Sequence, residues 1–76
     1  MLVNVSNCKI ITPVGTMDFY LPFKDRSMVA SRIENIIQTG GTFRYKDVRS
    51  NVIVLSKKLL ATSIITFSSS HNKTFA

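Results

Sequence analysis

The chain has little of what a catalytic or metal site needs. Its 76 residues include one cysteine, one histidine and four carboxylates. A single cysteine excludes an internal disulfide framework and cannot build a zinc site alone. The four acidic residues are Asp18, Asp25, Glu34 and Asp47. They are scattered along the chain, so no pair of them is expected to be placed for acid–base catalysis. We therefore expect neither enzymatic activity nor a bound metal or cofactor.

The single histidine, the single cysteine and the paired glycines are not expected to form a catalytic or phosphate-binding site. His71 follows three serines in a polar segment, where nothing would hold a catalytic base in place. Cys8 alternates with Ile10, which is typical of a small buried side chain in a strand. Gly40-Gly41 follows a predicted helix rather than preceding one, which excludes a phosphate-binding loop there.

Long apolar runs are also missing. No stretch approaches the 18 apolar residues of a membrane span, so we expect no membrane partner. The first ten residues lack the basic and apolar regions of a signal peptide, which favours a cytoplasmic location. The composition, 45% hydrophobic and 18% charged, indicates one small folded domain with a modest core.

Strand-like alternation dominates the first third of the chain. Apolar residues in 2–12 and 16–21 predict two strands, and Pro13-Val14-Gly15 predicts the turn of a hairpin between them. The apolar positions change parity near Ser6-Asn7, which indicates a bulge or break.

Residues 25–39 have the period of an amphipathic helix. One apolar stripe contains Val29, Ile33, Ile36 and Ile37. Asp25 or Ser27 is expected to cap the start, and Gly40-Gly41 is expected to end the helix.

A second β region follows, with strands expected over 43–46, 52–55 and 62–67. The predicted class is α+β: a small antiparallel sheet in the order β-β-α-β-β-β with one helix packed on it. A sheet curled toward a barrel is the alternative. Residues 1–67 are predicted to form the domain, and residues 68–76 a polar, mobile C-terminal tail.

The strand at 52–55 is apolar on both faces. Val52 and Val54 point one way, while Ile53 and Leu55 point the other. One helix covers only one face of a sheet, so the second face needs a barrel interior, a homodimer or another protein. We assign the apolar partner contact to Ile53 and Leu55.

Positive charge is concentrated in the predicted hairpin of residues 42–58. This segment holds five basic residues and one acid, a net +4 of the chain's +6. The candidate contact residues here are Arg44, Tyr45, Lys46, Arg49, Lys57 and Lys58. Lys57-Lys58 should lie near Arg44, with Arg49 at the opposite end. Tyr45 or Tyr20 would supply a ring for stacking a base.

Two functions fit these features. The first is a small regulatory or inhibitory protein that docks on an acidic or apolar protein surface through the second sheet face and the basic hairpin. The second is a nucleic-acid-binding accessory protein whose hairpin contacts phosphates.

Overall fold

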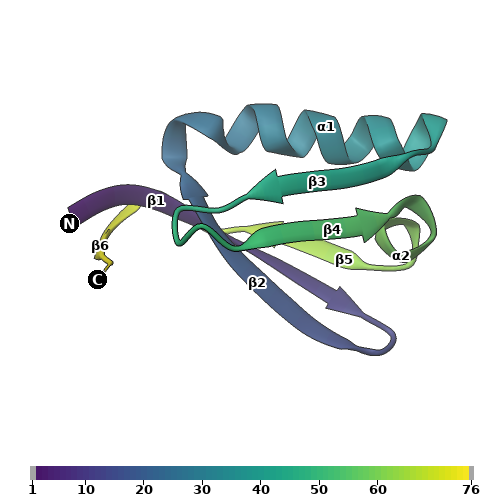
Figure 1. Ribbon diagram of the computed structural model, residues 1–76, viewed down its shortest axis with the longest axis horizontal. Coiled ribbons are helices and arrows are strands. Elements are labelled where there is room, and N and C mark those ends of the chain that lie inside the picture. Colours follow the sequence, from purple (N-terminus) through teal and green to yellow (C-terminus); the bar gives the residue numbers. More distant parts are fainter. Residues whose placement is uncertain (1, 76) are drawn as a thin grey trace.

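The computed structural model describes residues 2–75 as two antiparallel sheets and two α-helices (Figure 1). The elements are β1 (Leu2–Thr12), β2 (Gly15–Pro22), the 3-10 turn η1 (Phe23–Asp25), α1 (Arg26–Thr39), β3 (Thr42–Lys46), β4 (Val52–Ser56), α2 (Lys57–Ala61), β5 (Ile64–Phe67) and β6 (His71–Thr74). The predicted α+β class is confirmed. The two sheets stay separate, so the described strands close no barrel and the barrel alternative is not supported.

β1 is the central strand of the larger sheet. β2 pairs along one edge, while β5 and β6 share the other. The predicted hairpin of β1 and β2 is confirmed, with Thr12 paired to Gly15 across a two-residue connection. Gly15 has a φ of 148°, which a residue with a Cβ rarely adopts. The Thr12 hydroxyl donates to the Gly15 carbonyl at 2.7 Å and holds the turn closed.

A bulge separates β5 from β6. Between Val5↔His71 and Cys8↔Phe67, β1 has two residues and the opposing chain has three. The buried Ser6 hydroxyl donates to the Ser68 carbonyl at 2.7 Å, and the Asn7 amide donates to the Ser68 hydroxyl at 2.8 Å. The irregularity predicted near Ser6-Asn7 is therefore present, but the extra residue belongs to the facing segment.

The predicted mobile tail is wrong for its middle part. Residues 71–74 form β6, which pairs with β1 from Leu2 to Val5. The four residues of β6 are all polar and all exposed, so the segment has no alternation of apolar and polar residues. Backbone pairing forms this strand, and a side-chain pattern could not reveal it.

Helix α1 confirms the predicted helix almost residue for residue. Val29, Ile33 and Ile36 are buried, and Ile37 packs against them. Asp25 occupies the N-cap position but accepts no capping hydrogen bond, so the expected cap is absent. The helix ends as predicted, where the Gly40 amide donates to the Ile36 carbonyl at 2.8 Å.

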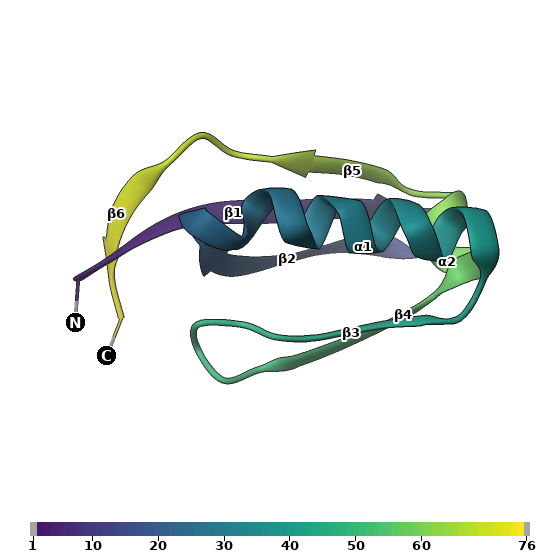
Figure 2. The same ribbon diagram turned by 90° about the horizontal axis from the view of Figure 1, so that it is seen from above.

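The core lies between α1, the larger sheet and the β3–β4 hairpin. Figure 2 shows α1 running over β1 and β2, with the hairpin beside them. The rings of Phe19 and Phe43 lie 6.4 Å apart and join the two sheets. The buried core contains Cys8, Ile10, Phe19, Leu21, Val29, Ile33, Ile36, Phe43, Leu55 and Leu60.

A short helix, α2, occupies part of the predicted break after β4. The Ser56 hydroxyl accepts a hydrogen bond from the Leu59 amide at 3.2 Å, which caps the helix, and Leu60 enters the core. Five residues are too few for a helical period to show in the sequence. None of the described helices is long and apolar enough to cross a membrane.

Candidate binding surfaces

The β3–β4 hairpin has one buried face and one solvent face. Phe43 pairs with Leu55 and Tyr45 with Ile53 on the side that packs into the core. On the solvent side the strand pairs are Thr42↔Ser56, Arg44↔Val54 and Lys46↔Val52. We call these six residues the hairpin face.

The assignment of the apolar contact to Ile53 and Leu55 is corrected by this register. Leu55 is 2% exposed and Ile53 is half-buried, because both pack against the core. Val52 and Val54 take the solvent side and are 59% and 50% exposed. The strand has the two apolar faces that the sequence indicated, but the uncovered one carries the valines.

Tyr45 also faces inward. Its ring stacks on Phe43 with centroids 6.2 Å apart and lies 5.6 Å from the Phe19 centroid. Burial, followed by the nearby carboxylates of Asp25 and Asp47, raises the pKa of the Tyr45 hydroxyl. The ring is therefore part of the core and is no stacking platform on the hairpin face.

The cations on and beside the hairpin face form no salt bridge among residues 2–75. Arg44 and Lys46 are exposed on β3, and Lys57 and Lys58 are exposed in the first turn of α2. Within residues 2–75, the salt bridge of the structure joins Arg49 to Asp47 and involves none of these four. Lys57 follows Ser56, which pairs with Thr42, so these lysines lie at the Arg44 end as predicted.

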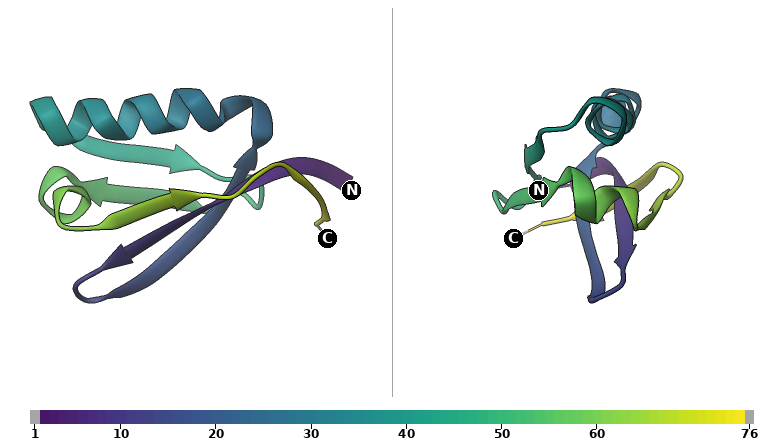
Figure 3. Two further views of the ribbon diagram at one scale, coloured as in Figure 1. Left: turned by 180° about the vertical axis from the view of Figure 1, so that it is seen from behind. Right: turned by 90° about the vertical axis from the view of Figure 1, so that its right-hand side faces the viewer.

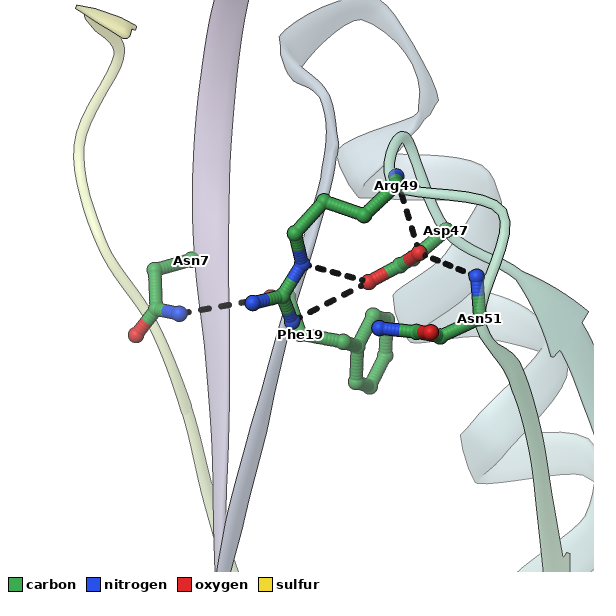
Figure 4. A network of polar contacts seen from close by, with 5 residues as sticks. All are labelled: Asn7, Phe19, Asp47, Arg49 and Asn51. Atoms are coloured by element: carbon green, nitrogen blue, oxygen red, sulfur yellow. Dashed lines mark hydrogen bonds and ion pairs between the residues drawn. The ribbon is translucent and has the colours of Figure 1, made fainter. Parts of the chain in front are cut away.

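Arg49 belongs to a different environment, the turn between β3 and β4 (Figure 4). The Asp47 carboxylate is buried and accepts from the amides of Arg49 and Asn51, each at 2.9 Å. It also accepts from Arg49 Nε at 3.2 Å. Arg49 thus lies at the far end of the hairpin from Lys57, and its guanidinium faces Tyr20.

Tyr20 is the centre of a cluster that the sequence did not reveal. The guanidinium of Arg49 and the ammonium of Lys73 lie 5.2 and 5.1 Å from the ring centroid. His71 and Phe75 approach the same ring edge-on, at 6.3 and 5.5 Å. The pairing of β6 brings His71, Lys73 and Phe75 to Tyr20, and the β3–β4 turn brings Arg49, so no local pattern could have indicated the cluster. The Tyr20 ring is therefore already in contact with two cations and two rings of the protein itself, which makes it a poor platform for a base.

The groups considered for chemistry lie apart. Cys8 is fully buried, and burial raises the pKa of its thiol to about 12. His71 is exposed on β6, distant along the sheet from Cys8. Among the described residues, no group of three histidine, cysteine or acidic side chains could hold a metal ion.

Comparison of the chain with protein-family models, with curated proteins and with solved structures finds no match. The function is therefore inferred from the surfaces described above.

Proposed function

We propose that the protein is a non-enzymatic regulatory or inhibitory module that docks on an acidic protein surface through the hairpin face. One observation supports this most directly: each exposed cation of β3 is paired across the hairpin with an exposed valine, Arg44 with Val54 and Lys46 with Val52. A partner surface with carboxylates beside apolar side chains complements both rows. Lys57 and Lys58 extend the positive row toward α2.

The same face fits a nucleic acid less well. Phosphates would engage the cations, but they would leave Val52 and Val54 without apolar contact. Tyr45, which lies between Arg44 and Lys46 in sequence, is half-buried and packs against the core. A protein partner uses both the charged and the apolar row, so we favour it over nucleic acid.

Two synthetic acidic peptides and a DNA duplex distinguish these partners. One peptide alternates glutamate and leucine, and the other has the same number of glutamates with serine in place of leucine. Fluorescence anisotropy with the unmodified protein should give tighter binding of the glutamate–leucine peptide than of the glutamate–serine peptide or the duplex. Tighter binding of the duplex, with a steep loss of affinity as salt rises, would contradict the proposal.

Matched variants locate the binding. Arg44→Glu with Lys46→Glu should greatly weaken binding of both peptides. Lys9→Glu with Lys24→Glu makes the same change in net charge at exposed positions outside the hairpin, and should reduce binding much less. Val52→Ser with Val54→Ser should remove the preference for leucine while leaving the glutamate–serine peptide unaffected. Equal loss in both charge-reversal variants would mean that net charge, rather than the hairpin face, attracts the peptides.

A further inference from the structure

β2 and β4, which belong to different sheets, diverge along their length. The two strands come together at the Asp47–Asn51 turn, where the Val48 amide donates to the Tyr20 carbonyl at 3.2 Å. From there β2 diverges from β4 toward the β1–β2 turn, as the front and rear views show (Figures 1 and 3). The two strands are also apart in the view from above (Figure 2). No ladder joins them, since β2 and β4 belong to different sheets.

The edge of β2 that faces away from β1 carries backbone groups that belong to no ladder. The Tyr20 carbonyl points away from β1, because it accepts from Val48. In an antiparallel strand, every second residue directs its N–H and C=O the same way. Asp18 and Thr16 therefore point their backbone groups outward, and both residues are exposed.

An apolar groove lies between the β1–β2 turn and α2. The groove has a volume of about 490 Å³ and is lined by Pro13, Val14, Ser56, Lys58, Leu59 and Thr62. A smaller hollow of about 230 Å³ adjoins it at Thr16, Met17 and Leu59. Val14 is 89% exposed, which is unusual for a valine beside other apolar groups. Lys58, which forms no salt bridge among residues 2–75, places a cation on the rim.

We propose that an extended segment of a partner protein adds to this edge of β2 as an antiparallel strand. Its backbone pairs with Thr16 and Asp18, an apolar side chain enters the groove against Val14 and Leu59, and an acidic side chain reaches Lys58. Strand addition uses main-chain hydrogen bonds for affinity and alternate side-chain pockets for specificity. The bond from Val48 to Tyr20 shows that this edge already accepts a partner where the sheets meet.

This surface borders the hairpin face at Ser56, and Lys58 lies beside both, so the test first removes the two cations of β3. The test uses Arg44→Glu with Lys46→Glu as the background, because that protein lacks the first surface. The probe is an acetylated and amidated peptide of alternating valine and glutamate, and a matched peptide with proline at its central position cannot form the ladder. In ¹⁵N-resolved NMR titrations, the first peptide should shift the amide signals of Thr16, Asp18 and Leu59. The proline peptide should not.

Proline at position 18 tests the backbone itself. Asp18→Pro removes an outward N–H while leaving the pairing of Met17 and Phe19 with β1, and prolines are tolerated on strand edges. We expect Asp18→Pro to weaken the binding of the valine–glutamate peptide about tenfold. Asp18→Ala, which keeps the N–H, should bind at least as well as the background protein.

Three results would overturn the proposal: no binding at millimolar peptide, binding that is unchanged by Asp18→Pro, or signal changes confined to residues away from β2 and α2. If Asp18→Pro unfolds, Lys58→Glu and Lys24→Glu decide the question. Lys58→Glu should abolish binding of the peptide. Lys24→Glu changes a surface away from the groove and should leave binding intact. The amide signals of Thr16 and Asp18, which lie on β2 outside the hairpin face, report this site whether or not the hairpin face binds its own partner.

Discussion

Asp47 and Arg49 are joined twice, once through the backbone and once through the side chain. Asp47 Oδ1 accepts from the Arg49 amide at 2.9 Å, and Oδ2 accepts from Arg49 Nε at 3.2 Å. This double contact stabilises the turn, and the turn holds the Arg49 guanidinium over the Tyr20 ring. The orientation of the hairpin relative to the larger sheet depends on these contacts and on the adjacent bond from Val48 to Tyr20.

Asp47→Ala should destabilise the protein by about 1–3 kcal/mol, because the amides of Arg49 and Asn51 lose their acceptor. Urea denaturation followed by circular dichroism measures the change. Asp18→Ala removes an exposed carboxylate instead and should alter the free energy of unfolding by less than about 0.5 kcal/mol. Equal effects of the two substitutions would show that the Asp47 contacts do not stabilise the turn.

Substitution by lysine should affect stability very differently at two neighbouring residues of β4. Leu55→Lys places a cation in the core and should cost more than about 3 kcal/mol, most of the stability of so small a domain. Val54→Lys, one residue earlier on the solvent side, should change stability by less than about 0.5 kcal/mol. Thermal melts of the two variants report this directly, and a stable Leu55→Lys protein would contradict the strand register.

Tyr20→Leu should loosen β6 while leaving the rest of the fold intact. The substitution keeps an apolar side chain on β2 but removes the ring that Lys73, His71 and Phe75 contact. Amide hydrogen exchange over residues 71–74 should accelerate about tenfold, corresponding to about 1–1.5 kcal/mol of cation–π and aromatic contact. Phe23→Leu, an exposed ring that contacts Arg26 instead, should leave exchange in β6 unchanged.

Cys8 should make the protein less stable in alkali. Burial raises the pKa of its thiol to about 12, so between pH 9 and 12 the unfolded chain loses a proton that the folded chain keeps. Stability therefore falls as pH rises through this range, and below pH 9 the thiol makes no pH-dependent contribution. Urea midpoints from pH 7 to 11 should decline more steeply for the unmodified protein than for Cys8→Ala. Parallel declines would show that the thiol is not buried as described.

The elements with strong local signals were predicted well. The β1–β2 hairpin follows from alternation on both sides of Pro13-Val14-Gly15, and α1 follows from a stripe that recurs every three or four residues. β6 and α2 were missed for different reasons. β6 has four exposed side chains and forms through backbone pairing with β1, while α2 has only five residues.

The candidate site was predicted in part. The sequence located the positive charge in residues 42–58 and indicated that residues 52–55 have two apolar faces. Alternation alone is symmetrical, so it could not say whether Ile53 and Leu55 or Val52 and Val54 face solvent. Arg49, counted with the other cations from its place in the chain, is instead held by Asp47 and turned toward Tyr20.

By itself, then, the sequence determined the class of the fold, the hairpin, the main helix and where the charge concentrates, because these depend on composition and on the spacing of nearby residues. Tertiary structure decided which face of β4 is buried, how β6 returns to β1, and that β2 and β4 separate after Val48 meets Tyr20. Each of these depends on contacts between residues far apart in the chain. The packing of Phe19 against Phe43 and Tyr45 sets the side of the hairpin that is covered, and thereby leaves the paired cations and valines exposed.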